Sequence, residues 1–179
     1  MASMANNMPK LKTIGIQQPE TAYIDRYAVR IVALNPLGDV AIIYVKRGNY
    51  LKLPGGGIEI NEDHHNAAQR EVEEETGAVV SLRGTGCIAT TEEFRSDLHQ
   101  ISYCYLADVL DTSGNPSLTE EERIDGLSHQ WLPINKAIEA MTSAEPTSEL
   151  GRYIQERDVY LLTEVRKVLE DGHEQVDRN

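Results

Sequence analysis

The stretch that decides the fold reads Leu53-Pro-Gly-Gly-Gly-Ile-Glu-Ile-Asn-Glu-Asp-His-His-Asn-Ala-Ala-Gln-Arg-Glu-Val-Glu-Glu-Glu-Thr-Gly-Ala78. It opens with three glycines, continues over a segment of helix length and closes with Gly77. We predict a helix over residues 63–76, because glycine suits the left-handed conformation that commonly follows a helix. The glycines before it lack Cβ atoms, so the backbone there can approach a ligand closely.

The end of the predicted helix carries a dense run of carboxylates. A helix advances about 100° per residue, so Glu71, Glu74 and Glu75 fall within an arc of roughly 100°. Glu73 points away from them and is interpreted as solvated. By itself, such a run is typical of a solvated acidic face. Three converging carboxylates also suit a hard divalent cation, because Mg²⁺ prefers oxygen ligands and shares them with substrate phosphates.

The carboxylates have companions at fixed spacings, which favours the metal site. The spaced residues are Gly56, Glu62, Arg70, Glu71, Glu74, Glu75 and Gly77. With an apolar residue after Glu71 and another after Gly77, the pattern is similar in every fixed position to the Nudix box. The chain therefore resembles the Nudix hydrolases of the MutT type, over the box itself and more loosely over residues 25–170.

The resemblance implies both a fold and an activity. Nudix proteins have an α/β fold, an α/β/α sandwich in which a mixed β-sheet carries the box as a loop–helix–loop. They are mostly hydrolases of a nucleoside diphosphate linked to another moiety, with Mg²⁺ or Mn²⁺ as cofactor. The chemistry agrees, because phosphoanhydride cleavage needs neutralised phosphates and an activated water molecule, and a bound metal supplies both.

The resemblance also implies roles for individual residues. The implied metal ligands are Glu71, Glu74 and Glu75, completed by a carbonyl oxygen of Gly55 or Gly56. Glu62 is implied as a supporting acid that acts through water or orients the other carboxylates. Arg70 is implied as the partner that pairs with a box carboxylate and holds its rotamer.

Composition limits the classes of partner. The chain has 179 residues and a formal net charge of −12, which disfavours nucleic-acid polymers because binding to them depends on Lys and Arg. No apolar run has the length of a membrane span, and the N-terminus lacks the apolar core of a secretory signal. We therefore expect a cytoplasmic enzyme that acts on a small-molecule nucleotide, without a membrane or nucleic-acid partner.

The order of the predicted elements agrees with the implied fold. We expect a flexible arm over residues 1–20, one Nudix domain over 21–172 and a frayed tail over 173–179. Strands are predicted over 27–34, 40–47, 50–53, 99–109 and 127–132. Residues 78–91 are predicted to contain a further strand, broken by Gly84 and Gly86. Helices after the box are predicted over 135–141, 149–156 and 159–170. Strands, box helix, strands and terminal helices in this order favour a mixed sheet with helices on both faces.

Three residues outside the box are candidates for substrate contact. Arg47 ends a strand just before the box and could hold a phosphate in a bidentate contact, although a surface role is equally consistent. Tyr50 could stack on a base, and Trp131 could flank a base pocket. For both aromatic residues, packing in the core or at its rim is the simpler interpretation.

Nudix hydrolases often take a further acid from a loop distant in sequence, as a ligand or general base. In this chain Glu120 or Glu121 is the expected acid, because this run stands before the strand that carries Trp131. Glu92 and Glu93 are the alternatives, and a solvated charge run is the ordinary interpretation of any one of them.

The substrate class is inferred by elimination. Beyond the box, the chain lacks the signatures of the ADP-ribose, dinucleoside polyphosphate, NADH and coenzyme A hydrolases. This leaves a nucleoside triphosphate pyrophosphohydrolase, with oxidised dNTPs among its candidate substrates. The alternatives are hydrolysis of ADP-ribose, a sugar nucleotide or a dinucleoside polyphosphate, and a nucleotide-sensing domain without turnover. The Tyr-rich strand 101–107 could face a core or a second copy, so a homodimer stays open.

Overall fold

The computed structural model describes residues 9–176. The strands are β1 (Lys10–Ile14), β2 (Ile24–Leu34), β3 (Asp39–Val45), β4 (Tyr50–Lys52), β5 (Val79–Leu82), β6 (Ala89–Arg95), β7 (Leu98–Asp111) and β8 (Leu127–Pro133). The helices are α1 (His64–Thr76), α2 (Glu120–Asp125), α3 (Ile134–Ser143) and α4 (Glu149–Val176). Within this part of the chain, no helix combines the length and apolar character needed to cross a membrane.

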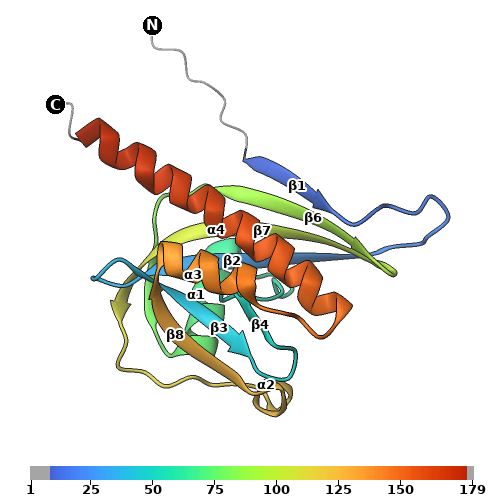
Figure 1. Cartoon of the computed structure of the whole chain (residues 1–179), viewed down its shortest axis with the longest axis horizontal. Coiled ribbons are helices and arrows are strands. Elements are labelled where there is room, and N and C mark those ends of the chain that lie inside the picture. The colour runs from blue at the N-terminus through green and yellow to red at the C-terminus, as the bar shows by residue number, and fades with distance from the viewer. Residues whose placement is uncertain (1–8, 177–179) are drawn as a thin grey trace, which may run out of the picture.

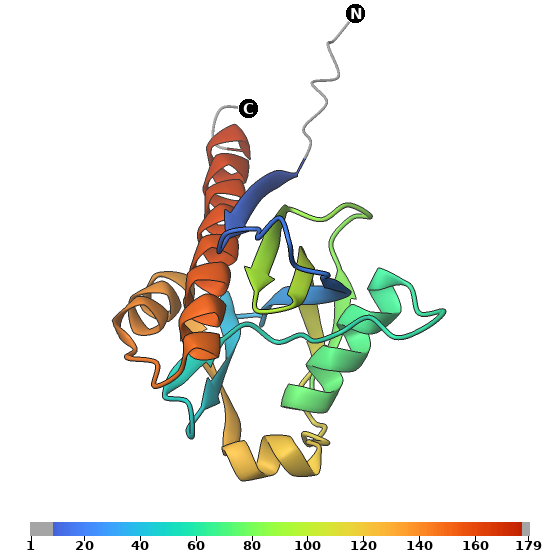
Figure 2. The same ribbon diagram turned by 90° about the vertical axis from the view of Figure 1, so that its right-hand side faces the viewer.

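The strands form one mixed sheet between two helical layers. Its order is β1-β6-β7-β2-β3-β4, with β5 paired to β7 and β8 paired to β3 (Figure 1). β2 runs parallel to β7, and β1 runs parallel to β6, whereas the other pairs are antiparallel. α1 covers one face of the sheet, and α3 and α4 cover the other (Figure 2). The predicted α/β/α sandwich is confirmed.

Two apolar clusters join the layers through β2, whose second half is buried throughout. Val29 and Ile31 pack with Val72 of α1 on one face of the sheet. Val32 packs with Leu161 of α4 on the other face. A strand covered on both faces is expected to be largely apolar, and the buried half of β2 is so apart from Arg30.

The glycine loop, residues 54–58, lies beside β2 in the plane of the sheet. β2 and β3 pair through a single residue pair, and the edge of β2 beyond it bonds to this loop instead. The amide of Val29 donates to the carbonyl of Gly56 over 3.0 Å. A Cβ on Gly55 would lie 2.1 Å from the carbonyl oxygen of Val29. Only glycine therefore lets the loop lie this close to the strand.

The box helix α1 is fixed at both ends. Asp63 caps the first turn, where its Oδ1 accepts the amide of Asn66 over 2.8 Å. Gly77 follows the last turn with φ 75°, and its amide donates to the carbonyl of Glu73. These caps satisfy backbone groups that a helix end leaves open. The rotation of α1 buries Ala67, Ala68 and Val72 against the sheet and leaves Glu73 exposed, as predicted.

The expectations for the two chain ends are wrong in part. Residues 10–14, expected in a flexible arm, form β1, because they complete the backbone hydrogen bonding of β6 in parallel register. The two predicted C-terminal helices are one helix, α4, which continues through Arg157 and Asp158, side chains that are buried rather than part of a break. Helix also covers residues 173–176 of the predicted tail. Residues 1–8 and 177–179 lie outside the described part.

Candidate active site

Two box glutamates, Glu71 and Glu75, are buried between α1 and the glycine loop. A Cβ on Gly56 would lie 2.4 Å from Oε1 of Glu71, so the missing side chain makes room for that carboxylate. Oε2 of Glu75 accepts the amide of Gly55 over 2.9 Å. Glu74, one turn after Arg70, is only partly buried. The fold therefore brings carboxylates predicted as metal ligands against the predicted carbonyl donors.

Arg70 links the acids of the box. Its Nε and Nη2 donate to the two carboxylate oxygens of Glu62, each over 2.8 Å. Its Nη1 donates to Glu71 over 2.9 Å and to Glu74 over 3.2 Å. Nη2 also donates to the carbonyl of Gly57 over 3.0 Å. All five guanidinium N–H groups are used, which agrees with the predicted role of Arg70 as partner of the box carboxylates.

Lys52, at the end of β4, belongs to the site but was not among the predicted residues. Its Nζ lies 2.5 Å from Oε1 of Glu75 and 3.5 Å from the carbonyl oxygen of Gly55. The Nudix box begins after this position, so its pattern gave no signal. The sequence did contain a weak signal for this role, because the charged Lys52 stands between Leu51 and Leu53, which both belong to the buried core.

The surroundings shift the pKa values of two box acids in opposite directions. Burial raises the pKa of Glu71, while hydrogen bonds from Arg70 oppose the shift. Hydrogen bonds from Arg70 are also the main reason that the pKa of Glu62 is lowered. Glu62 is therefore the stable counter-charge of Arg70, whereas a further positive charge near Glu71 would oppose the effect of burial on its pKa.

The carboxylate and carbonyl oxygens of the box are the types of donor that a hard divalent cation prefers. As the side chains stand, no three Asp, Glu, His or Cys residues in the described part are grouped closely enough to hold a metal. Arg70 and Lys52 engage the box carboxylates instead. The carbonyl of Gly56 accepts the amide of Val29, and the carbonyl of Gly55 faces only the distant Lys52 among the described groups. Of the two predicted carbonyl ligands, Gly55 is thus the freer acceptor.

The three predicted substrate contacts outside the box lie apart from it. Arg47 is exposed, and its Nη1 lies 3.4 Å from Oδ1 of Asp125. Tyr50 is buried in a small cluster with Ile154, and Trp131 packs against the cluster beneath α1. Within the described residues, no hydrogen bond or ion pair joins any of the three to the box. Packing accounts for both aromatic residues, and the substrate contacts stay predictions.

The loop before α2 packs against the end of the box helix. The amide of Ser117 donates to the carbonyl of Glu74 over 2.7 Å. A Cβ on Gly77 would lie 2.5 Å from the carbonyl oxygen of Gly114, so two glycines allow this contact between α1 and the loop. The loop thereby brings the acidic start of α2 toward the end of α1 that carries the box glutamates.

The acids of α2 differ in what they contact. Glu122 forms a capping box with Thr119, in which each side chain accepts the other residue's amide. Glu120 pairs with Arg123 over 3.0 Å. Glu121 is exposed. Of the two predicted acids, Glu121 is thus the one whose carboxylate the helix itself does not engage.

The alternative acids, Glu92 and Glu93, lie on β6. Oε1 of Glu92 lies 2.9 Å from Nε2 of His99. Glu93 is buried, and its Oε2 accepts from Arg157 and Gln100. Neither contacts a box residue through a hydrogen bond in the described part of the chain.

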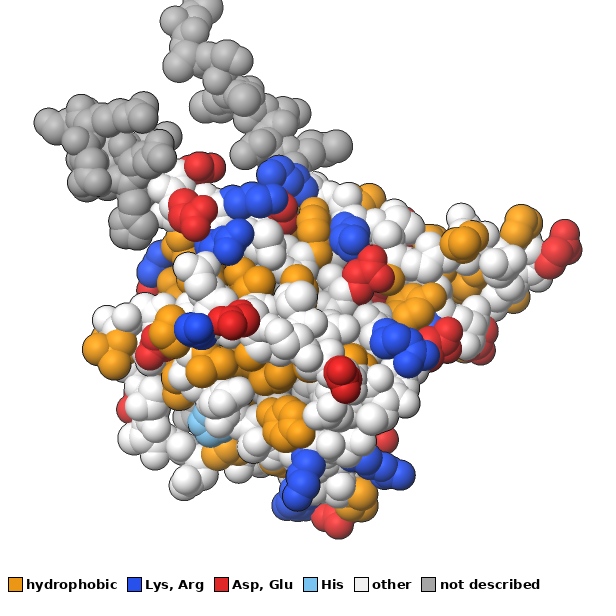
Figure 3. All heavy atoms as spheres, viewed as in Figure 1, with side chains coloured by type: hydrophobic (Ala, Val, Ile, Leu, Met, Phe, Trp, Pro, Cys, Tyr) orange, Lys and Arg blue, Asp and Glu red, His pale blue; other side chains and the backbone are white. Residues whose placement is uncertain are grey.

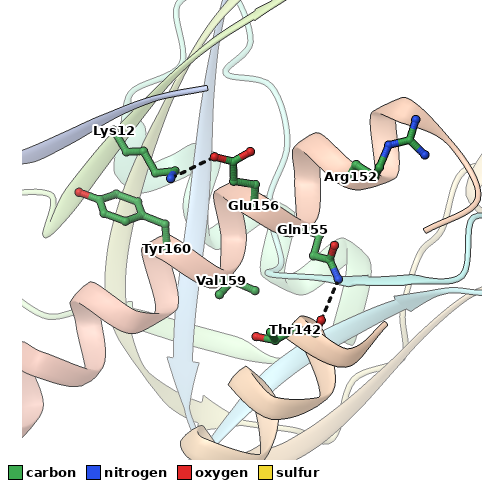
Figure 4. Close-up of a pocket in the computed structure, with 7 residues that line it drawn as sticks. All are labelled: Lys12, Thr142, Arg152, Gln155, Glu156, Val159 and Tyr160. Atoms are coloured by element: carbon green, nitrogen blue, oxygen red, sulfur yellow. Dashed lines mark hydrogen bonds and ion pairs between the residues drawn. The ribbon is translucent and has the colours of Figure 1, made fainter. Parts of the chain in front are cut away.

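A separate hollow of about 490 Å³ lies between β1, α3 and α4 (Figure 4). Lys12 and Glu156 form an ion pair of 3.0 Å on one side of it. Gln155 reaches the carbonyl of Thr142 on the other side. No box residue lines this hollow, so it is not the predicted active site. The same face of the molecule mixes basic and acidic side chains (Figure 3).

The NUDIX domain family model matches residues 25–168. The chain belongs to the NUDIX domain family. The match includes the whole box and extends from β2 into α4. The resemblance inferred from the box alone is therefore confirmed at the level of the family, and Glu71, Arg70 and their partners form the box of a NUDIX domain.

A curated relative and several solved structures resemble this NUDIX chain. CMP-5'-(N-acetyl-N-hydroxy-3-aminopropyl)phosphonate hydrolase of Streptomyces rubellomurinus is 32% identical over 92 residues, which are 51% of this chain and 42% of that relative. The matched region thus spans less than half of the relative's length. Among structures, the MutT protein from Methanosarcina mazei Go1 aligns with TM-score 0.56 and 15% identity, over 81% of this chain and 96% of that one.

Two further structures show the same fold. A hydrolase of the NUDIX family from Clostridium perfringens aligns with TM-score 0.56 and 19% identity, over 82% of this chain and 99% of that one. A UDP-X diphosphatase aligns with TM-score 0.56 and 19% identity, over 87% of this chain and 68% of that one. At these identities the likeness concerns the fold, and the chemistry has to be argued from the site.

Proposed function

We propose that this NUDIX protein hydrolyses a phosphoanhydride bond in a nucleoside diphosphate linked to another moiety, with Mg²⁺ or Mn²⁺ as cofactor. The observation that carries the proposal is the placement of Glu71 and Glu75 against the glycine loop, with Arg70 engaging the neighbouring acids. Burying carboxylates costs stability, and so does a loop that only glycine can form. A chain that keeps both has a functional reason for them.

The proposal gives each part of the site a task. Glu71, Glu74, Glu75 and the carbonyl of Gly55 would hold the metal. When bound, the metal neutralises phosphate charge and makes a water molecule more acidic. Arg70 keeps Glu71 and Glu74 in place, because one guanidinium group bonds to both.

The proton of the attacking water needs an acceptor close to the site. We assign it to an acid of α2, because the contact between Ser117 and Glu74 carries the start of α2 toward the box helix. Glu121 is favoured over Glu120, which pairs with Arg123. General-base catalysis of this kind contributes roughly 10²–10⁴-fold to a rate.

Nucleoside triphosphates are the first candidate substrates, with release of pyrophosphate and a nucleoside monophosphate. One observation favours a second class, nucleotides linked to a group that is not a nucleotide. The relative from Streptomyces rubellomurinus is named as a hydrolase of a CMP phosphonate conjugate. ADP-ribose, sugar nucleotides and dinucleoside polyphosphates belong to the same wider class.

A hydrolysis panel tests the proposal. The purified protein is incubated with Mg²⁺ or Mn²⁺ and dNTPs, oxidised dNTPs, ADP-ribose, CMP conjugates, sugar nucleotides or dinucleoside polyphosphates, and the products are separated. Glu74→Gln should lower kcat by about a hundredfold or more, because losing a metal ligand costs several kcal/mol at about 1.4 kcal/mol per tenfold. Glu73→Gln, an exposed neighbour on the same helix, is the matched control and should keep the wild-type rate.

The products decide between the candidate classes. Pyrophosphate from one triphosphate supports the first class, and monophosphates from a conjugate support the second. A Glu74→Gln rate within about tenfold of wild type would show that the metal role is wrong. Nucleotide binding without turnover on the whole panel would replace the hydrolase with a nucleotide sensor.

A further inference from the structure

A polar region lies buried on the sheet face that α4 covers. It contains Arg30, Thr91, Glu93, Gln100, Ser102, Arg157 and Asp158. The register explains how the strands bring it together, because Gln100 pairs with Glu93 on one side and with Arg26 on the other. The surface between a sheet and its helix is usually apolar. A polar interior of this size therefore needs a reason other than packing.

Positive charge exceeds negative charge in this region. We use the name arginine cluster for Arg26, Arg30, Arg95 and Arg157. Two acids, Glu93 and Asp158, lie within it, and both engage Arg157. Arg157 Nε lies 2.6 Å from Asp158 Oδ1, and Arg157 Nη1 lies 3.3 Å from Glu93 Oε2. Asp158 also accepts the amide of Leu53 over 2.9 Å.

Arg30 is the buried charge that these acids do not pair with. Its Nη1 donates to the carbonyl of Val29, and within the described part of the chain its Nε is buried without a hydrogen-bond partner. The Nε of Arg95 and the hydroxyl of Thr91, both on β6 and separated from β2 by β7, are also buried without partners there. Three unpaired polar atoms on one sheet face are unusual, because buried donors are nearly always bonded.

The electrostatic surroundings agree with an excess of positive charge. Burial and then repulsion from Arg157 lower the pKa of Arg30 to about 10. The same two causes, in the same order, lower the pKa of Arg26. Glu71, across the glycine loop, acts in the opposite direction and favours the charged form of Arg26.

Arg26 connects the arginine cluster with the box. The residue as a whole is exposed, but its guanidinium group is partly buried where Nη1 donates to Oε1 of Gln100. A Cβ on Gly57 would lie 3.3 Å from Nη2 of Arg26, and Arg70 donates to the carbonyl of the same glycine. Gly57 therefore lies between the two guanidinium groups. A phosphate chain that started at the box carboxylates and continued along the loop would meet Arg26.

We propose that Arg26, backed by Arg30 and Arg157, forms a subsite for a tetrahedral oxyanion, the phosphate or phosphonate group of the substrate that lies beyond the metal-bound phosphate. That this anion belongs to the substrate rests on the proposed function, whereas the binding of an anion at Arg26 does not. A guanidinium group matches such an oxyanion with two parallel hydrogen bonds. The subsite favours substrates with a second anionic group over conjugates whose other moiety is neutral.

The test measures anion binding without a metal. Inorganic pyrophosphate is titrated calorimetrically into the full-length protein in EDTA, which removes the contribution of the box as a metal site. Arg26→Gln should weaken pyrophosphate binding at least tenfold. Arg83→Gln is the matched control, because Arg83 is also exposed and paired on the sheet, through Asp108, and should bind as wild type.

A second variant covers the case in which Arg26→Gln does not fold. If the melting temperature shows that Arg26→Gln is unfolded, Arg26→Lys replaces it, which keeps the charge but loses the planar fork and should weaken binding at least threefold. Wild-type affinity in the folded Arg26 variant, or no pyrophosphate binding by the wild type, overturns the subsite. Arg26-dependent binding combined with a silent hydrolysis panel keeps the subsite and removes the proposed function. Hydrolysis by the wild type, combined with pyrophosphate binding that does not depend on Arg26, keeps the proposed function and removes the subsite.

Discussion

The glycine loop separates two charged regions of opposite character. On the side of α1 lies the box face, made of Lys52, Glu62, Arg70, Glu71, Glu74 and Glu75. On the side of α4 lies the arginine cluster with its two acids, Glu93 and Asp158. The box face has four carboxylates and two cations, whereas the cluster has four cations and two carboxylates. A metal–phosphate complex would bring the charge that each region lacks. Its cation would balance the carboxylates of the box face, and its anion would balance the arginine cluster.

The two regions also differ in how they are assembled. The box face takes most of its contacts from one helix and the loop before it, and Arg70 bonds to its direct neighbour and to the residue one turn later. The arginine cluster and its acids come from β2, β6 and α4, and Arg157 and Glu93 are 64 positions apart. Local charge patterns are visible in a sequence, and distant ones become visible only after folding.

The largest expected effect tests whether the arginine cluster supports the fold. Asp158→Ala should lower the free energy of unfolding by about 3–5 kcal/mol, because it leaves the buried Arg157 without its main partner. Urea denaturation followed by circular dichroism measures the change. Asp125→Ala removes the partner of the exposed Arg47 and should cost about 0–1 kcal/mol. Equal losses in the two variants would show that the cluster is no more than surface charge.

The next effect tests whether the box face is organised by Arg70. Arg70→Lys keeps the charge but cannot reproduce five hydrogen bonds from a planar group. We expect Mn²⁺ affinity, measured calorimetrically, to fall by about 10–100-fold, as is typical when the support of metal ligands is lost. An unchanged Mn²⁺ affinity in a folded variant would mean that Glu71 and Glu74 reach their positions without this support.

The smallest effect concerns an exposed ionic contact outside both regions. His99 lies between Asp25 and Glu92, whose hydrogen bonds raise its pKa above 6.5, with Asp25 contributing most. A raised pKa in the folded state means that the stabilisation is fully present below pH 6.5 and is lost as the pH rises through the folded value. Thermal melting between pH 6 and pH 8 should show this loss in the wild type.

The control for this pH dependence is His99→Gln, which removes the titrating group. Its melting temperature should change less over the same interval. If wild type and variant lose the same amount between pH 6 and pH 8, another group is responsible. If removing the contacts of His99 lowers the free energy of unfolding as much as Asp158→Ala does, the distinction between buried and exposed charges is wrong.

The sequence by itself determined the family, the box helix and much of the sheet. Fixed spacings located Arg70 and the box glutamates, because residues three and four apart share one face of any helix. The strand predicted over residues 27–34, a run rich in β-forming residues, lies within β2. Boundaries were predicted less well. β1 forms through contacts with distant residues, by pairing with β6 and through ion pairs with α4, and α4 passes without a break through Arg157 and Asp158.

Only the tertiary structure decided which charges meet. Lys52 reaches Glu75 because β4 ends beside α1, and Arg26 reaches Gly57 because the glycine loop lies along β2. The arginine cluster depends on the register of three strands and on the rotation of α4. Such contacts join residues that are far apart in the chain, and no local period marks them. The physical reason is that helix geometry is set by the neighbouring residues, whereas compensation of buried charge is set by whatever the whole fold brings within reach.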